Sequence, residues 1–160
     1  MNPPEIKPIK RSEALAPLSR EHHDALLLSW KIRTGISNGI SCARIIEYCK
    51  AFYTHHMVAH FEAEEAWIPG ILPAEDPLLL QMMDEHRRIK AALLILSEED
   101  VHCNTSLEAF AKLVTDHVRF EERTLYNHIE KLATKEQLET FYKNHVTSHS
   151  PEWTDTFWLK

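Results

Sequence analysis

The sequence predicts an all-α fold, an antiparallel up-down-up-down four-helix bundle with a short extra C-terminal helix. Three observations lead to this prediction. The 160 residues include only three glycines, too few for the tight turns that a β fold needs. Four stretches are long and amphipathic, with apolar residues three or four apart. The segments between them are short, so neighbouring helices are expected to run in opposite directions.

Start and stop signals bound the first two helices. The first is expected from about Pro17 to Thr34, with proline in the first turn, and Gly35 and Gly39 are expected to end it. The second follows Ser41 as N-cap and continues without a breaker through residue 67, before Pro69 and Gly70.

Caps also mark the remaining helices. Asp76, followed by a proline, opens a third helix that reaches about residue 96. A capping-box pattern, Thr105 with Glu108, opens a fourth helix through about residue 133. The same pattern at Thr134 and Gln137 opens a shorter fifth helix, which is expected to end near residue 147.

The chain therefore divides into three expected parts. Residues 1–11 are proline-rich and predict an extended N-terminal arm. Residues 12–133 form the bundle. Residues 134–160 form the short helix and an aromatic tail (Trp153, Phe157, Trp158) that packs on the bundle. The same aromatic side chains could instead contact a second copy, which leaves a homodimer open.

Composition excludes several functions. A net charge of −6 and a pI near 6.0 provide no basic stripe for nucleic acid. No apolar run approaches the roughly 20 residues of a membrane span. The first residues lack an apolar signal core, which predicts a cytoplasmic protein. Three cysteines without metal-type pairing fit reduced thiols.

Histidine is the unusual residue type, with eleven in the chain. Each of the four long helices carries one near its middle, within the apolar stripe: His22, His60, His86 and His117. Two of these are followed four residues later by a glutamate, Glu64 and Glu121. Residues four apart lie on the same side of a helix, so ring and carboxylate can hold one ion.

A metal centre is the interpretation that satisfies all six groups. A lone histidine on an apolar face is usually a core residue with one hydrogen-bond partner, and a bundle that only buries its histidines is the alternative. Six such groups in one small core would be costly without a cation. Imidazole and carboxylate without thiolate favour iron or manganese. Shared between two ions, the set gives each two histidines, with the glutamates bridging and positions left for an oxo or hydroxo bridge.

Three segments resemble the hemerythrin-like, or HHE cation-binding, family of four-helix bundles over about residues 15–130. They are Leu18-Ser-Arg-Glu-His22, His60-Phe-Glu-Ala-Glu64-Glu65-Ala66, and His117-Val-Arg-Phe-Glu121-Glu122 followed by Leu125-Tyr126. The resemblance implies a non-haem di-iron centre. It places His22 and His60 on one iron and His86 and His117 on the other, with Glu64 and Glu121 bridging.

Five further residues are candidates for the surroundings of the ions. His23 adjoins His22 and is the alternative ligand from the first helix, although it points about 100° away. His56 and Tyr53 lie about one and two turns before His60 and could line the pocket or bond to the ligands. Glu122 is a candidate for an outer contact. Met82 is a core residue or a wall of the open side of the iron pair.

The resemblance also guides the functional prediction. Oxygen-carrying hemerythrins have a further histidine where this chain has Met82, which favours bacterial relatives with two histidines on each iron. We therefore expect a binding protein that binds or senses oxygen or nitric oxide. The alternative is a di-iron enzyme that reduces nitric oxide or peroxide, or repairs iron centres under nitrosative or oxidative stress. Such an enzyme would need an electron-donor protein.

Overall fold

The fold is described from a computed structural model that covers residues 2–3 and 11–159. Over these residues the chain is helical and contains no β-strand. The all-α prediction is confirmed. The predicted N-terminal arm, residues 1–11, falls largely outside the described residues, and only residues 2, 3 and 11 of it are described.

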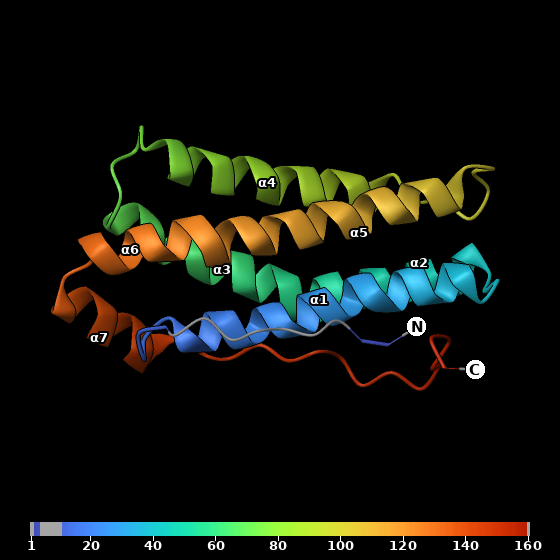
Figure 1. The fold of residues 1–160 in the computed structure, drawn as a ribbon, viewed down its shortest axis with the longest axis horizontal. Coiled ribbons are helices and arrows are strands. Elements are labelled where there is room, and N and C mark those ends of the chain that lie inside the picture. The colour runs from blue at the N-terminus through green and yellow to red at the C-terminus, as the bar shows by residue number, and fades with distance from the viewer. Residues whose placement is uncertain (1, 4–10, 160) are drawn as a thin grey trace.

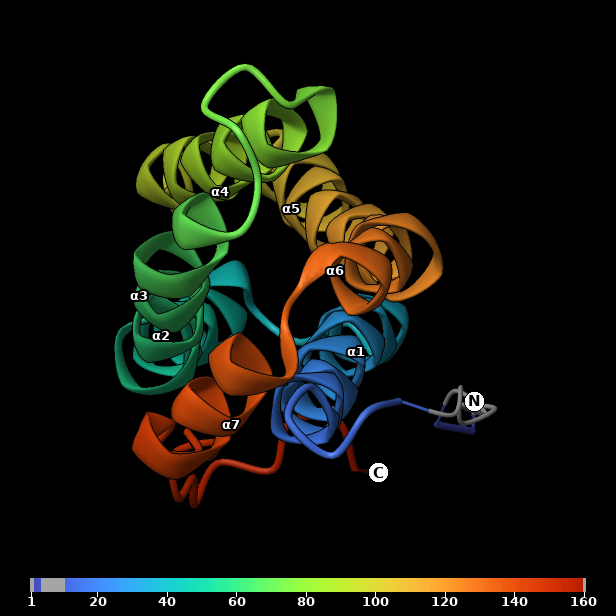
Figure 2. The same cartoon turned by 90° about the vertical axis from the view of Figure 1, so that its left-hand side faces the viewer.

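Four long helical rods lie side by side along the long axis of the molecule (Figures 1 and 2). The first rod is α1 (Ala16–Ser37), and the third is α4 (Pro77–Leu94). The second consists of α2 (Cys42–Phe52), η1 (Tyr53–Met57) and α3 (Val58–Trp67). The fourth consists of α5 (Cys103–Phe120), η3 (Glu121–Leu125) and α6 (Tyr126–Leu132). The 3₁₀ turn η2 (Ile68–Gly70) ends the second rod, and α7 (Lys135–Asn144) follows the fourth.

Most helix ends lie where local chemistry predicts them. Gly39 has φ +70° and separates the first two rods. Gly35 does not end α1, because it lies inside the helix, which continues to Ser37. The Asp76 side chain caps α4 by accepting from Leu78 N at 2.8 Å. Thr134 forms the predicted capping box with Gln137.

The capping box predicted at Thr105 is wrong. Helix α5 begins at Cys103 with His102 as its N-cap, three residues before the predicted N-cap. Asp100 explains the shift, because its side chain accepts from His102 N at 2.9 Å and its carbonyl accepts from Cys103 N at 3.0 Å. The turn that these bonds form starts the helix before Thr105 is reached.

The second and fourth rods each contain a π-helical segment that periodicity does not predict. These segments, η1 and η3, interrupt the α-helical hydrogen bonding in the interior of a rod. π turns inside α-helices occur frequently at functional sites. Both lie beside candidate ligands, since η1 ends three residues before His60 and η3 begins at Glu121.

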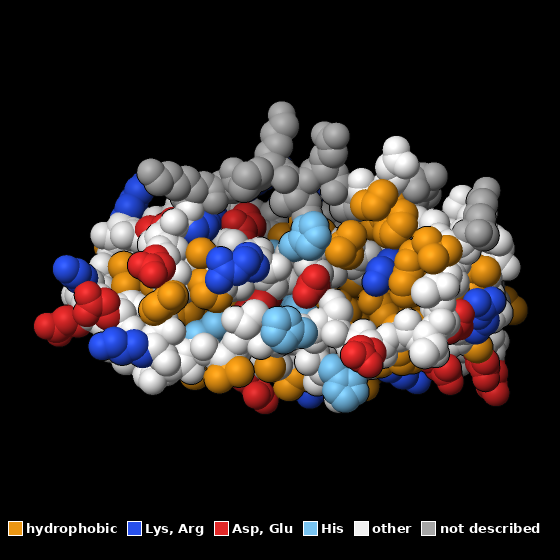
Figure 3. Space-filling view, turned by 90° about the horizontal axis from the view of Figure 1, so that it is seen from below, with side chains coloured by type: hydrophobic (Ala, Val, Ile, Leu, Met, Phe, Trp, Pro, Cys, Tyr) orange, Lys and Arg blue, Asp and Glu red, His pale blue; other side chains and the backbone are white. Residues whose placement is uncertain are grey.

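Beyond α7 the chain runs back along α1 toward the other end of the bundle (Figure 1). The ring of Phe141 in α7 stacks on Trp67, with centroids 4.1 Å apart. Near the C-terminus, Trp153 and Phe157 contact the ring of Tyr48. Histidine side chains gather near the middle of the face seen in Figure 3, and hydrophobic side chains in its right half.

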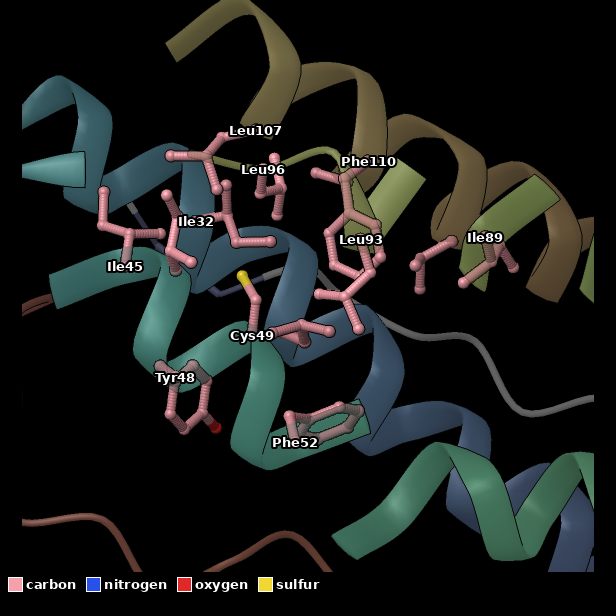
Figure 4. Close-up of a cluster of buried hydrophobic side chains, with 14 of the residues drawn as sticks. Ile32, Ile45, Tyr48, Cys49, Phe52, Ile89, Leu93, Leu96, Leu107 and Phe110 are labelled. Carbon is pink, nitrogen blue, oxygen red and sulfur yellow. The ribbon is translucent and has the colours of Figure 1, made fainter. Parts of the chain in front are cut away.

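Two apolar clusters fill the interior. The large core includes the residues labelled in Figure 4, namely Ile32, Ile45, Tyr48, Cys49, Phe52, Ile89, Leu93, Leu96, Leu107 and Phe110. The small core contains Leu15, Leu18, Ile68, Leu72, Leu79, Met82, Leu125, Tyr126, Ile129 and Phe141. Among the described residues, no helix combines the length and apolarity needed to span a membrane.

Each rod contributes residues to both cores, and the order in which it reaches them differs from one rod to the next. α1 begins in the small core at Leu18 and reaches the large core at Ala25. The second rod passes from the large core to the small core, the third from small to large, and the fourth from large to small. The interval between the two cores is therefore common to all four rods. His22 and His86 lie in that interval, and His60 and His117 lie at its edge, each directly before the last large-core residue of its rod, Phe61 or Val118.

Gly35 provides a test of how closely the C-terminal segment packs on the bundle. A Cβ at this position would lie 2.9 Å from Phe157 Cδ2 and 3.0 Å from Ile45 Cδ1. Overpacking costs about 1–3 kcal/mol, whereas alanine gains about 1 kcal/mol over glycine in a helix. We expect Gly35→Ala to lower the free energy of unfolding, measured by urea denaturation.

The sign of the effect should reverse when Phe157 is truncated. In a Phe157→Ala background both ring contacts are gone and only the terminal methyl of Ile45, at 3.0 Å, remains close. Because the end of a flexible side chain can shift, the helix term of about 1 kcal/mol should outweigh that contact, so Gly35→Ala should stabilise. Gly70→Ala is the matched control, because no heavy atom lies within 4 Å of its Cβ position. An unchanged sign in the Phe157→Ala background would contradict the predicted contact.

Candidate metal centre

The six side chains predicted as ligands meet between the two cores. Among residues 2–3 and 11–159, two groups of side chains could hold a cation. Within each group, one ligand atom per residue lies within 4.8 Å of the others. The groups are His22, His60, Glu64 and Glu121, and Glu64, His86, His117 and Glu121. All six residues are buried.

Glu64 and Glu121 belong to both groups, and each lies within 3.3 Å of one histidine from each group. Glu121 Oε1 lies 2.9 Å from His22 Nε2 and 3.0 Å from His117 Nε2. Glu64 Oε1 lies 3.2 Å from Nε2 of His60 and 3.3 Å from Nε2 of His86. Each of these four histidines therefore presents Nε2 to a shared carboxylate. This is the arrangement expected of two ions bridged by two glutamates.

Several of these buried atoms lack a hydrogen bond. Five atoms have no hydrogen-bond partner: His60 Nε2, His86 Nε2, His117 Nε2, Glu64 Oε1 and Glu121 Oε2. The first four lie within ion-pair distance of an opposite group but do not form a hydrogen bond with it. Buried polar atoms without partners are costly. Bonds of about 2.0–2.2 Å from imidazole nitrogen or carboxylate oxygen to a metal would satisfy them. The donor set therefore fits a pair of cations.

A second set of glutamates contacts the opposite nitrogen, Nδ1, of each ring. His22 Nδ1 lies 2.7 Å from Glu122, and His117 Nδ1 lies 2.8 Å from Glu85. The other two distances are longer, 3.3 Å from His60 Nδ1 to Glu21 and 3.4 Å from His86 Nδ1 to Glu65. A carboxylate on the far nitrogen fixes the orientation of a ligating imidazole and raises its basicity.

These outer glutamates form a closed ring around the bundle. The glutamate on each rod contacts the histidine of the next rod, and the fourth rod supports the first. Each outer glutamate is also the sequence neighbour of a predicted ligand, in the pairs Glu21-His22, Glu64-Glu65, Glu85-His86 and Glu121-Glu122. That adjacency is a sequence signal, but which histidine each glutamate reaches depends on the neighbouring rod.

The electrostatics of the cluster favour positive charge. Burial lowers the pKa of the four histidines, but the adjacent carboxylates outweigh it and raise each pKa, that of His117 to about 10. Burial raises the pKa of Glu121, yet His117, His22 and His60 hold that pKa well below its usual value. The shared carboxylate therefore stays ionised in a dry site.

Tyr126 contacts the cluster although its role was not predicted. Its hydroxyl donates to Glu64 Oε2 at 2.8 Å and lies 3.3 Å from His22 Nε2. Burial and then the charges of Glu121 and Glu64 raise the pKa of Tyr126 far above its usual value, so the hydroxyl keeps its proton. The π turn η3 accounts for its direction, because i→i+5 bonding brings Tyr126 to the side of Glu121.

A small cavity adjoins the cluster on the side of the large core. Its walls include His22, His60 and His117, with apolar side chains such as Phe61 and Val114. About 10 Å³ is open to the centre of a water-sized molecule, roughly the minimum that one water needs.

Of the residues predicted to surround the ligands, some contact the cluster or line the cavity and others do not. His56 is buried and lines the cavity, and Glu122 contacts His22. His23 was a wrong alternative, because it is exposed while His22 faces the cluster. Tyr53 is half-buried and packs its ring 6.5 Å from Phe61 rather than lining the cavity.

Met82 does not wall the cavity either. It is fully buried in the small core, on the other side of the ligand cluster. Its position one turn before His86 directs it toward Leu79 and the end of the bundle where η2 lies. Met82 is therefore a core residue in this fold.

The chain was also compared with known proteins. The family described as Hemerythrin HHE cation binding domain matches residues 13–129. No curated protein and no solved structure matches the chain. The matched region contains all six ligand candidates and all four outer glutamates. The chain belongs to the hemerythrin HHE cation-binding domain family.

Proposed function

We propose that this protein binds two iron ions and uses them to bind or sense oxygen or nitric oxide. His22 and His60 would hold one ion and His86 and His117 the other, with Glu64 and Glu121 shared. The observation that carries the proposal is the membership of both glutamates in both ligand groups. The proposal includes the antiparallel up-down-up-down topology, which the alternating order of the two cores supports.

The donor chemistry supports iron, with manganese as the alternative in one or both positions. The cluster offers imidazole nitrogen and carboxylate oxygen and no thiolate, since the three cysteines lie outside both ligand groups. Each ion would receive two histidines and two shared carboxylates. This leaves positions for an oxo or hydroxo bridge and for an exogenous ligand.

The cavity supports a diatomic ligand. It is small, largely apolar and bordered by histidines of both groups. Two ferrous ions, when bound, supply the electrons that oxygen takes up on binding. The chain holds the shared carboxylates in place, keeps a proton on the Tyr126 hydroxyl beside Glu64, and excludes bulk water. The predicted cytoplasmic location stays a prediction.

Metal content tests the ligand assignment. We expect freshly isolated protein to contain about two irons per chain and to show near-ultraviolet absorption from an oxo bridge. His60→Ala or His86→Ala should reduce the iron content by about one ion, whereas Glu121→Ala should reduce it by about two because this carboxylate serves both ions. Elemental analysis with an optical spectrum measures both quantities.

The matched control is His128→Ala, because His128 is a half-exposed residue that contacts Asp76 away from the cluster. Its iron content should equal that of the wild type. Wild-type protein that contains only zinc, or less than one iron per chain, would contradict the proposal.

Nitric oxide distinguishes binding from turnover. We expect anaerobic, di-ferrous protein to form a stable complex with nitric oxide, because a cavity that holds only a molecule of about the size of water adjoins the ligand cluster. The measurement is the optical spectrum together with nitrous oxide in the headspace. Release of nitrous oxide over several turnovers with a supplied electron donor would support the enzyme instead.

A further inference from the structure

The segment that follows α7, residues 145–150, is here called the strap. It runs beside α1 on the lower side of the bundle in Figure 1, and it lies beyond the family-matched region, which ends at residue 129. The side chain of His145, the first residue of the strap, is only 3% exposed.

Two residues of the strap bind Glu21. His145 Nε2 lies 2.9 Å from Glu21 Oε1. The backbone N–H of Ser148 donates to Glu21 Oε2 at 2.7 Å, and the Ser148 hydroxyl donates to the same oxygen. A third contact follows one turn along α1, where Ser150 hydrogen-bonds to Asp24. The strap is therefore held at two successive turns of α1.

Glu21 is also the outer partner of a ligand candidate. Its Oε1 lies 3.3 Å from His60 Nδ1, so the carboxylate stands between the strap and the His60 ring. It differs from the other outer glutamates in its environment. The Glu21 side chain is 1% exposed, against 18% for Glu122, 19% for Glu85 and 37% for Glu65.

The strap supplies Glu21 with hydrogen-bond donors that water would supply to an exposed carboxylate. A buried carboxylate needs hydrogen bonds to stay ionised and in place. The bonds to Glu21 from His145 and Ser148 come from the strap, whereas Glu122 is held by Arg11. Without the strap, Glu21 would gain access to water and lose the donors that fix its direction toward His60.

We propose that the strap is a positioning element of the metal centre: His145 and Ser148 hold Glu21, Glu21 orients His60, and strap docking thereby controls how firmly the ion on His22 and His60 is retained. This inference rests on the proposed two-ion function. It predicts an asymmetric effect, because the outer partners of His86 and His117 make no such contact with the strap.

The test compares full-length wild type with His145→Ala/Ser148→Ala, both loaded anaerobically with ferrous iron and then exposed to excess EDTA. Loss of an outer partner of a ligating histidine typically costs 10–100-fold in metal affinity. We expect one iron per chain to leave about 10–100-fold faster in the variant and the other to leave at the wild-type rate. Iron remaining on the protein is measured over time by elemental analysis.

Four further variants distinguish an effect on the position of Glu21 from a general loosening of the fold. His145→Gln keeps a side-chain N–H donor and should restore much of the slow release. Glu21→Ala should reproduce the fast loss of one iron, and adding His145→Ala to it should cause little further change, because both act through the same contact. His149→Ala, an exposed residue of the same strap, should behave as wild type.

Equal acceleration of both irons, or no acceleration, would overturn the inference. The inference would also be overturned if His145→Gln lost iron as fast as His145→Ala/Ser148→Ala does. Far-UV circular dichroism of each variant shows whether the helices are intact. Wild-type protein that never holds two irons would instead overturn the proposed function, so the two failures are distinguishable.

Discussion

The structure depends on the burial of two carboxylates among four imidazoles in the interval between two apolar cores. Neither carboxylate can reach water, and each contacts a histidine from both ligand groups. Ionised groups are tolerated in such a place only when opposite charge compensates them. These groups meet because each rod is long enough to reach both apolar clusters and carries its ligand residues between its two ends.

The ring of outer glutamates couples the four rods to one another. Because each rod supports the histidine of the next one, no ligand is oriented by its own helix alone. A displacement of any rod would disturb the histidine on that rod and also the histidine of the next rod, which the outer glutamate of the displaced rod contacts. The geometry of the site therefore follows from the positions of the four rods. A shift of one helix by one residue along the bundle would break the contacts between the outer glutamates and the histidines.

Sequence periodicity predicted the helices and the six clustered residues, because spacings of three and four fix which side of a helix a residue takes. Periodicity also favoured His22 over His23, and in the structure His22 lies in the cluster whereas His23 is exposed. It could not predict contacts made between helices, and so it missed Glu21, Glu85 and the role of Tyr126. The π turns also escaped it. The π turn η3 changes the direction of Tyr126 but leaves no gap in the apolar pattern of the sequence. The burial of His145 was also missed, because the tail that contains it has no periodic pattern of apolar residues.

The two halves of the centre differ in their surroundings. The half formed by His22 and His60 borders the cavity with both of its histidines. Of its two outer carboxylates, Glu21 is sealed by the strap, and Glu122 is partly exposed and held by Arg11. In the other half only His117 borders the cavity, and the outer carboxylates Glu65 and Glu85 are partly open to solvent. A symmetric ligand set is thus placed in an asymmetric environment. Because water access and hydrogen bonding to the ligands set the redox potential of a bound metal, two ions of the same element would not be equivalent in this protein.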